Sequence, residues 1–374
     1  MPGRRGVLLF AEDPGALNLF ADLPRTLAAC GVPAKLLASG QAQTALQAAG
    51  APHAALRPGQ SAGAILDELQ PTLYVTGTST NERTMGLSLV EACRDRGIAT
   101  VGAVDAPMNA GRRFAGPFPD EPLRFAPDHL LVIDDWTAQA FEDLGYPRER
   151  IMVCGHPHFD RVLDARDAFN REGRDAVRRR ALPPALLDAT VVTFVSEGSS
   201  RILLWDGRAG EKNWMRGWTG RNGRTELAFE TLRPLLRDTF PQARLVFRLH
   251  PKDALPDFEA YAGDVDAFSA GGNPLEVAFA SDLVVGTTSM LMTEAALLGV
   301  PILCLIPQES ERAWLPVVGA TDGHFAASMD SLATALRNLR ENWPPAGARI
   351  AGDSLRGATG RIADFLCRKA GPGK

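Results

Sequence analysis

The chain has 374 residues, of which 22% are charged, and its formal net charge is −4. This length exceeds one ordinary hydrophobic core, so we expect two domains, and the acidic balance excludes a protein that coats nucleic acid. The five cysteines are scattered and odd in number, which favours free, mostly buried thiols in a reducing compartment.

Short apolar runs alternate with helical patterns through the first half of the chain. The pattern predicts strands at 6–10, 32–38, 72–75, 99–104, 129–133 and 151–154. Helices are expected at 16–30, 41–49, 62–69, 84–96 and 136–144. This β-α-β rhythm predicts a parallel sheet with helices on both faces.

The same rhythm restarts after a polar helix at 159–180 and a break at Pro183-Pro184. We expect strands at 190–195, 244–249, 283–285 and 301–305, with helices at 225–239, 290–298, 331–342 and 356–368. The predicted fold class is α/β, with two Rossmann-like, doubly wound parallel-sheet domains facing across a cleft. Their predicted ranges are 1–160 for an acceptor domain and 161–350 for a nucleotide-donor domain. Residues 351–374 form a C-terminal helix, and its return to the first domain is left open.

The stretch 281–305 reads as strand, turn, helix and strand, and it is the most informative part of the chain. The turn Gly286-Thr287-Thr288-Ser289 opens the helix. Free backbone N–H groups and a positive dipole end at a helix start suit an anion such as a diphosphate. Glu294 follows on the same helix and is a candidate for binding ribose or sugar hydroxyls.

Two further loops of the second half follow strands and are candidates for binding donor phosphates, since ligands of such sheets lie beyond the carboxyl ends of the strands. Small residues suited to close backbone approach occur at Ser196, Gly198 and Ser199. A flexible loop is the alternative there. Arg248, His250 and Lys252 cluster at another strand end and favour an anion site over a purely structural histidine.

Acidic side chains follow the strands of the first half, where a carboxylate could act as general base. Asp13 is the preferred base and Asp105 the second choice, although Asp13 and Asp134 would also suit helix caps. Small or polar neighbours are assigned to the acceptor side: Glu12, Gly15, Asn18, Gly77 and Thr78.

Two other features stand out. His156 and His158 form an H-x-H pair, for which a hinge or cleft wall is preferred over metal binding, because no further ligand set follows. The segment 201–224 combines three tryptophans with basic residues and glycines. It could stack on a base or sugar, grip phosphates or touch an anionic membrane surface, and a locally packed subdomain is the alternative.

In combination these motifs resemble the GT-B superfamily of nucleotide-sugar enzymes. The matching segments are Val153-Cys154-Gly155-His156-Pro157, Arg248-Leu249-His250-Pro251 and the run from Ser281 to Pro301. Similar patterns occur in capsule and lipopolysaccharide glycosyltransferases and in hydrolysing nucleotide-sugar 2-epimerases. The resemblance implies that the second domain holds the donor and that the first approaches the acceptor. It also implies that no metal or other cofactor is needed.

The chain departs from this pattern at one informative position. Retaining enzymes of the superfamily carry two glutamates eight residues apart, and the residue eight after Glu294 is Ile302. This favours an inverting displacement. The acidic turn expected of a 2-epimerase is also absent. The segment Glu309-Ser310-Glu311-Arg312 resembles it only weakly.

The sequence therefore predicts an inverting, metal-independent glycosyltransferase that moves a sugar from a nucleotide-sugar donor to a glycan-type or small-molecule acceptor in surface-polysaccharide biosynthesis. A nucleotide-sugar 2-epimerase and a non-catalytic nucleotide or glycan binder are the alternatives. With no signal peptide and no run of about 18 apolar residues, we expect a cytoplasmic protein. Peripheral membrane contact through the 201–224 loop is left open.

Overall fold

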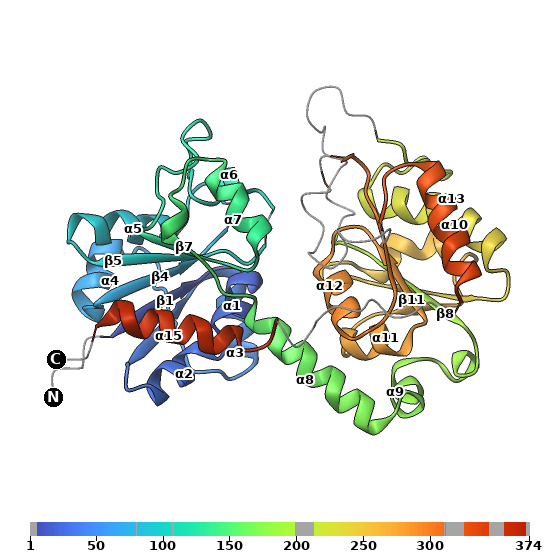
Figure 1. Ribbon diagram of the computed structural model, residues 1–374, viewed down its shortest axis with the longest axis horizontal. Coiled ribbons are helices and arrows are strands. Elements are labelled where there is room, and N and C mark those ends of the chain that lie inside the picture. The colour runs from blue at the N-terminus through green and yellow to red at the C-terminus, as the bar shows by residue number, and fades with distance from the viewer. Residues whose placement is uncertain are drawn as a thin grey trace. The chain divides into compact units, whose positions relative to one another are not determined.

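Two compact units make up the chain. The computed structural model describes residues 6–79, 81–106, 108–198, 213–309, 311, 325–343 and 355–371. The first unit comprises Met1–Asp160 and Leu355–Lys374, and the second comprises Arg161–Ser354 (Figure 1). The candidate site residues Ser199 and the 201–212 part of the loop lie outside the described residues.

A seven-stranded sheet forms the centre of the first unit, in the order β3-β2-β1-β4-β5-β6-β7. Its strands are β1 (Val7–Ala11), β2 (Ala34–Ala38), β3 (Ala54–Ala55), β4 (Leu73–Gly77), β5 (Ala99–Ala103), β6 (His129–Val132) and β7 (Ile151–Val153). All of their pairings are parallel. The predicted parallel sheet is confirmed, and its apolar strand sequences reflect burial on both faces.

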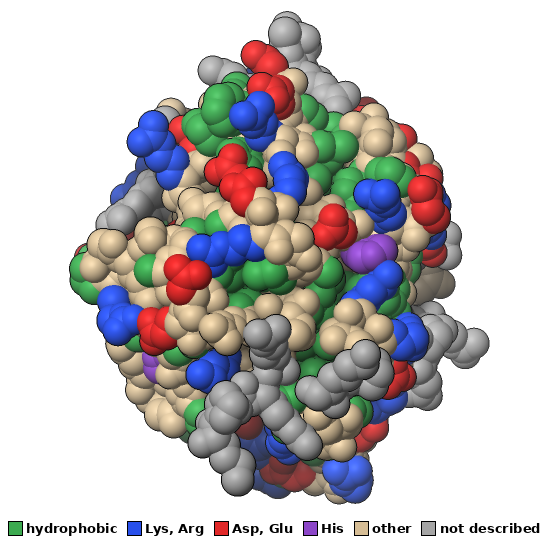
Figure 2. Space-filling model, turned by 90° about the vertical axis from the view of Figure 1, so that its left-hand side faces the viewer, with side chains coloured by type: hydrophobic (Ala, Val, Ile, Leu, Met, Phe, Trp, Pro, Cys, Tyr) green, Lys and Arg blue, Asp and Glu red, His purple; other side chains and the backbone are tan. Residues whose placement is uncertain are grey.

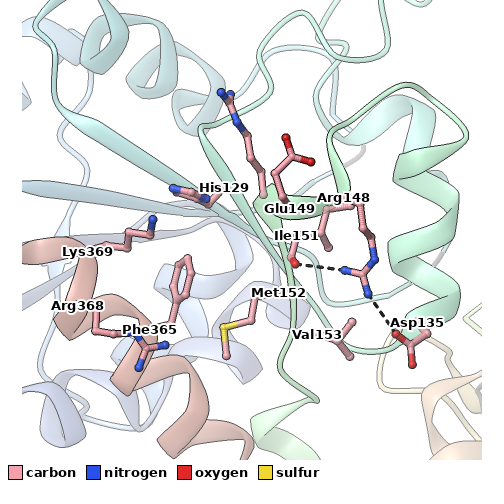
Figure 3. A pocket seen from close by; sticks show the side chains of 11 residues that line it. His129, Asp135, Arg148, Glu149, Ile151, Met152, Val153, Phe365, Arg368 and Lys369 are labelled. Atoms are coloured by element: carbon pink, nitrogen blue, oxygen red, sulfur yellow. Dashed lines mark hydrogen bonds and ion pairs between the residues drawn. The ribbon is translucent and has the colours of Figure 1, made fainter.

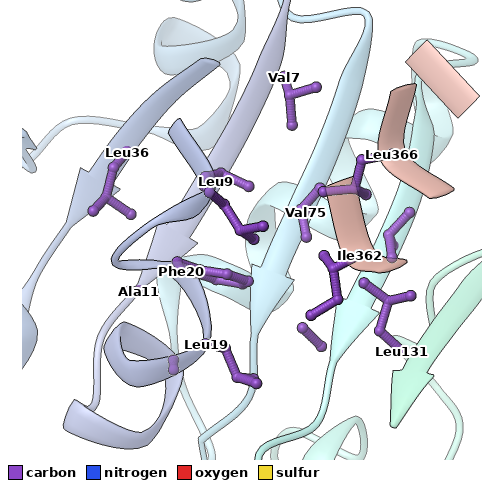
Figure 4. Packing of buried hydrophobic residues seen from close by; sticks show 14 of the residues in the cluster. Val7, Leu9, Ala11, Leu19, Phe20, Leu36, Val75, Leu131, Ile362 and Leu366 are labelled. Atoms are coloured by element: carbon purple, nitrogen blue, oxygen red, sulfur yellow. The ribbon is translucent and has the colours of Figure 1, made fainter. Parts of the chain in front are cut away.

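Helices cover both faces of this sheet. They are α1 (Pro14–Phe20), α2 (Leu23–Ala29), α3 (Gly40–Ala48), α4 (Ala62–Leu69), α5 (Met85–Asp95), α6 (Ala110–Arg113), α7 (Asp135–Glu142), the short η1 (Arg148–Arg150) and α15 (Ala358–Ala370). Alternate strand residues face opposite sides. Leu9 and Val75 pack with Phe20 and Leu366 in one core (Figure 4). The neighbouring residues Leu8 and Tyr74 belong to the core on the other face.

The C-terminal helix α15 belongs to the first unit, where it packs beside α2. Its inner side places Ile362 and Leu366 in the core. Asp160 accepts hydrogen bonds from the backbone N–H groups of Gly357 (2.8 Å) and Thr359 (3.3 Å), so this carboxylate binds the first turn of the helix. The last segment of the chain thereby completes a core that begins at residue 7.

The second unit contains a six-stranded sheet in the order β10-β9-β8-β11-β12-β13. Its strands are β8 (Val191–Val195), β9 (Arg244–Arg248), β10 (Ala267–Ser269), β11 (Leu283–Gly286), β12 (Ile302–Leu305) and β13 (Phe325–Ala326). These pairings are also parallel. Both sheets therefore run outwards from a central first strand in two directions, the doubly wound arrangement that the sequence predicts.

The helices of the second unit are α9 (Arg174–Ala181), η2 (Pro184–Leu186), α10 (Arg224–Thr239), η3 (Leu255–Tyr261), α11 (Pro274–Ala280), α12 (Met290–Leu297) and α13 (Met329–Glu341). The helix α8 (Pro157–Glu172) begins in the first unit and continues into the second. The main core of the second unit packs α10 and α13 on the sheet, with an aromatic cluster around Phe229, Phe247 and Tyr261.

Two helices expected as single elements are each divided. The predicted helix at 16–30 separates into α1 and α2 around Ala21-Asp22, since Pro24 fits only the first turn of a helix. The predicted helix at 159–180 ends at Glu172 and restarts at Arg174. Gly173 between them has φ +91°, a left-handed value that ends a helix and favours glycine.

The face of the molecule seen in Figure 2 mixes basic and acidic side chains over a largely polar surface, without a large area of one sign. Among the described residues, no helix is long and apolar enough to cross a membrane.

Candidate functional site

The chain reverses direction across the second sheet between β8 and β11. From β8 it moves to β9 and β10 on one side, and then crosses to β11 on the other. Ligands of doubly wound sheets bind beyond the carboxyl ends of the strands at such a reversal. The segments there are 196–198 after β8, 249–253 after β9 and 287–289 after β11.

Ser196 joins the ends of β8 and β9. Its hydroxyl donates to Asp253 Oδ2 (2.5 Å) and accepts from the backbone N–H of His250 (2.7 Å). The Ser196 side chain is buried, and its hydrogen bonds are already made within the protein. In the structure Ser196 positions His250.

The imidazole of His250 is held in one tautomer. Its Nδ1 accepts the backbone N–H of Lys252 (3.1 Å), so the neutral ring carries its proton on Nε2. Burial lowers the pKa of His250, and Lys252 lowers it further against the opposite effects of Asp253 and Glu197. His250 therefore offers a neutral N–H donor at the strand end.

Gly198 makes room for this ring. A Cβ at Gly198 would lie 2.7 Å from His250 Nδ1, and the backbone φ is +72°. Both facts favour glycine, because a side chain would collide with the imidazole and would strain the left-handed backbone. The small residue that the sequence suggested for close phosphate approach makes a close approach to His250 instead.

Arg248 is a buried cation without a carboxylate partner among the described residues. Its side chain is 5% exposed, and one guanidinium nitrogen donates to Ser269 Oγ (3.0 Å). Burial lowers the pKa of Arg248, and no charge of the described residues offsets this effect. A buried, uncompensated guanidinium is costly, so this position suits an anionic ligand.

The start of α12 already holds a carboxylate of the chain itself. Glu197 accepts the backbone N–H of Thr288 and its hydroxyl (3.1 Å), and Arg224 Nε donates to the same carboxylate (2.6 Å). Arg224 also forms an ion pair with Glu311. Burial alone would raise the pKa of Glu197, but Arg224 and the threonine hydrogen bonds bring it below its ordinary value.

Neither Glu197 nor Arg224 is among the site residues predicted from the sequence, and Glu311 is named there only as part of the segment 309–312. The available signal was an acidic residue directly after a buried strand, in the loop 196–200. Their cluster occupies the reversal point between β8 and β11. The N–H of Thr288, predicted to bind phosphate, is engaged by Glu197 in the structure.

The other residues of the segment 281–305 lie at both ends of β11, some before the strand and some after it. Ser289 caps α12 by accepting the N–H of Leu291 (3.4 Å). Glu294 is buried on that helix and Thr287 at its entrance. At the opposite end of the strand, Asp282 binds Arg174 (2.7 Å) and the backbone N–H of Val191 (2.8 Å). Asp282, at the start of the segment 281–305, therefore stabilises the fold and lies away from the carboxyl edge of the sheet.

Gly286 has a packing role. A Cβ there would lie 2.9 Å from Met292 Sδ and 3.3 Å from the carbonyl oxygen of Val195. Glycine thus allows α12 to pack closely against β8 and β11, as the third glycine of a dinucleotide-binding turn does.

In the first unit, Asp105 is committed to an ion pair. Its carboxylate binds Arg113 Nη1 (3.1 Å), and the Arg113 side chain is only 7% exposed. Arg113 also donates to Thr78 Oγ1 (3.2 Å) and to the carbonyl oxygen of Met108 (3.1 Å). A Cβ at Gly15 would lie 1.7 Å from Asp105 Oδ2, so Gly15 accommodates this carboxylate.

Glu12 is a partly unsatisfied carboxylate of this edge. Its Oε2 is buried without a hydrogen-bond partner, while Oε1 accepts from Asn81 (3.4 Å). Burial, with a further contribution from Asp13, raises the pKa of Glu12.

The two aspartates that could cap helices behave differently. Asp13 stands at the N-cap position of α1 but makes no capping hydrogen bond, whereas Asp134 caps α7 by accepting the backbone N–H of Thr137 (2.6 Å).

The remaining candidates of the first unit have mainly structural surroundings. Gly77 lets α1 approach β4, since a Cβ there would lie 2.3 Å from that of Ala16. Asn18 lies half-buried on α1. His156 is buried, and its Nδ1 accepts the backbone N–H of His158 (3.1 Å). Within the described residues, no three potential metal ligands come together.

The described end of the Trp-rich loop packs on α10. Trp214 Nε1 donates to the carbonyl oxygen of Ile306 (2.6 Å), and Glu230 binds the backbone N–H of Thr219 (3.0 Å). The phenol of Tyr261 donates to the same glutamate (2.5 Å). Residues 213–223 therefore form part of the second unit's packed structure.

No protein-family model and no curated protein sequence matches the chain. Solved structures match along nearly its whole length. A UDP-GlcNAc 2-epimerase from Neisseria meningitidis, bound to UDP-GlcNAc, has a TM-score of 0.65 at 14% identity, covering 96% of this chain and 99% of that one.

Two further matches have other descriptions. Anabaena Alr3699/HepE in complex with UDP has a TM-score of 0.61 at 12% identity, over 97% of this chain and 98% of that one. A glycosyltransferase from Rickettsia africae has a TM-score of 0.61 at 11% identity, over 98% and 97%. At these identities the likeness establishes the fold, and the chain has the two-domain GT-B fold.

Proposed function

We propose that the chain is a nucleotide-sugar enzyme whose second unit binds the donor diphosphate at the carboxyl edge of β8, β9 and β11. The observation that carries this proposal is Arg248, a buried guanidinium without a carboxylate partner in the described structure. His250, two residues further on, offers an Nε2–H. A diphosphate would supply the missing negative charge and accept that hydrogen bond. Similar structures that hold UDP support this choice of ligand.

The reaction that we propose is an inverting glycosyl transfer. A carboxylate takes the proton of an acceptor hydroxyl, whose oxygen attacks the anomeric carbon as the bond to the diphosphate breaks. The nucleoside diphosphate leaves with the bonding electrons, and Arg248 and His250 stabilise its charge. Glu294 is proposed to bind ribose or sugar hydroxyls. Neutralisation by these side chains makes a metal unnecessary in this scheme.

We propose Glu12 as the general base in place of Asp105, and Asp13 is the alternative. Asp105 is paired with a buried arginine, and a base must be free to accept a proton. Glu12 has a raised pKa and a buried carboxylate oxygen without a partner. A general base with a raised pKa accepts a proton more readily at neutral pH.

A nucleotide-sugar 2-epimerase is the second candidate. It is favoured by structural similarity to the Neisseria meningitidis 2-epimerase, which extends over 99% of that protein. The two candidates differ in their products, since a hydrolysing epimerase releases nucleoside diphosphate without an acceptor.

The test is incubation with a panel of UDP-, GDP- and CMP-sugars, with and without a mixture of saccharide acceptors. We expect nucleotide release that depends on the acceptor and persists in EDTA. Glu12→Gln should lower kcat at least about 100-fold, the usual contribution of a general base, and should leave UDP affinity unchanged. Glu91→Gln, at an exposed position of α5, is the matched control.

The pH profile sharpens this test. A base acts when deprotonated, so activity should rise as the pH passes upwards through the raised pKa of Glu12, above the ordinary value of 4.5. This acidic limb should be absent from the residual activity of Glu12→Gln. Release of equal amounts of nucleotide without acceptor would instead support the epimerase, and full activity of Glu12→Gln would remove Glu12 from the mechanism.

A further inference from the structure

The first unit contains a cavity of about 550 Å³ that the proposed reaction does not use. It lies between α15 and β7, the edge strand of the sheet (Figure 3). Its walls come from segments far apart in the sequence: His129 at the start of β6, residues 148–153 of η1 and β7, and Phe365, Arg368 and Lys369 of α15. The last three share one side of the helix, because they are spaced three and four residues apart.

Positive charge is in excess around this cavity. Four cationic side chains line it against Asp135 and Glu149. Arg148 is already engaged, since it binds Asp135 (3.5 Å), Glu142 (3.0 Å) and the carbonyl oxygen of Ile151 (3.3 Å).

The other three cations are Arg150, Arg368 and Lys369. Within the described residues none of them forms an ion pair with a carboxylate. A protein with a net charge of −4 thus places an excess of two positive charges, four cations against two carboxylates, around one cavity.

A ring pair forms part of the wall. His129 and Phe365 meet edge to face with their centroids 5.7 Å apart, and the Lys369 ammonium lies 5.5 Å from the Phe365 centroid. Burial, and then Lys369 and Arg150, lower the pKa of His129 against the opposite effect of Asp128. Burial, reinforced by the nearby cations, therefore favours the neutral imidazole.

We propose that this cavity binds a phosphate-bearing ligand. Phosphate carries up to two negative charges and several strong acceptors, which match the cations of η1 and α15 that line the cavity. The volume lies in the range of small-molecule sites. The ligand is either a soluble organic phosphate or the phosphate headgroup of a lipid, and both share this chemistry. The proposal is independent of the reaction assigned to the carboxyl edge of the second sheet.

The test uses inorganic pyrophosphate and calorimetric titration of the full-length protein. The double variant Arg368→Gln/Lys369→Gln removes two exposed charges from α15, and we expect it to weaken pyrophosphate binding at least tenfold. Arg337→Gln/Arg340→Gln removes two exposed charges from α13 and should bind as the wild type does. Titrations with and without saturating UDP separate this site from pyrophosphate binding at the second sheet.

A second arm distinguishes the two sources of phosphate. Co-sedimentation with phosphatidylcholine vesicles that contain phosphatidic acid, compared with phosphatidylcholine alone, detects a lipid headgroup. Pyrophosphate binding lost in the α15 variant supports a soluble ligand, and vesicle binding lost in that variant supports a lipid. The proposal is overturned if the wild type binds neither probe, or if the α15 and α13 variants bind both probes equally well. A urea unfolding transition of the α15 variant that matches that of the wild type shows that the variant is folded.

Discussion

At the residue scale, the proposed binding of the donor diphosphate at the carboxyl edge of the second sheet depends on how His250 is held. Its backbone N–H binds Ser196, its Nδ1 accepts from the backbone of Lys252, and its ring lies against Gly198. The sequence predicted that each of these three residues would contact the ligand directly. In the structure these residues orient one imidazole, which leaves Nε2–H as the group available to a phosphate.

This arrangement predicts a specific effect of Gly198→Ala. The new methyl group would displace the His250 ring, and the left-handed backbone would cost about 1–2 kcal/mol. Gly271→Ala is a matched control, because Gly271 has φ +65° and nothing within 4 Å of its Cβ position. Both variants should lose similar unfolding free energy in urea, and only Gly198→Ala should lose UDP affinity. Equal UDP affinities in the two variants would show that the ring's position is unimportant.

Sequence reasoning identified the loops of the site but not the state of each side chain. It placed His250 and Arg248 at a strand end, because residues after parallel strands gather at one edge. It could not tell that Asp105 would meet Arg113, which is eight residues away and beyond an irregular turn. The unpartnered oxygen of Glu12 was equally hidden, since hydrogen bonding of a carboxylate depends on neighbours from other strands.

At the scale of elements, α15 is the least local part of the first unit. It follows the whole second unit in the chain and still completes the core that contains Leu9 and Val75. The periodicity of its sequence predicted a helix near residues 356–368. The periodicity carried no information on which sheet the helix would cover, because an apolar face fits either domain.

Leu366→Ala tests how much α15 contributes. Leu366 is fully buried, and removal of a buried leucine side chain costs about 2–5 kcal/mol through lost burial and a cavity. We expect that loss in the free energy of unfolding measured in urea. Asp364→Ala, at an exposed position of the same helix, should change it by no more than about 0.5 kcal/mol. Similar small effects of both substitutions would mean that α15 is dispensable for the core.

The short elements were the hardest to predict. β3 and β13 have two residues each, and β10 has three. Such segments carry too few residues for a periodic pattern, and pairing with a neighbouring strand alone defines them. The long apolar strands at the centres of both sheets were predictable, because burial on both faces requires a continuous apolar run.

At the scale of the whole molecule, the fold and the chemistry rest on different evidence. The doubly wound sheets follow from the alternation of strands and helices, and solved structures of 11–14% identity share the fold. Those structures include both 2-epimerases and a glycosyltransferase, so the fold alone does not choose a reaction. The choice of reaction depends on the side chains at the carboxyl edges, Glu12 among them, whereas Arg248 supports the diphosphate-bearing donor that both reactions share.

Calorimetric titration of UDP into the wild type and Arg248→Gln tests the central claim most directly. Arg244→Gln, at the exposed opposite end of β9, is the control. We predict one UDP site in the wild type and the control, and at least tenfold weaker binding to Arg248→Gln, a loss of about 1.4 kcal/mol or more. The ligand-free Arg248→Gln protein should be no less stable than the wild type, because the substitution removes a buried charge that has no carboxylate partner in the described part of the chain. Absence of UDP binding to the wild type, or equal affinity in all three proteins, would contradict the account.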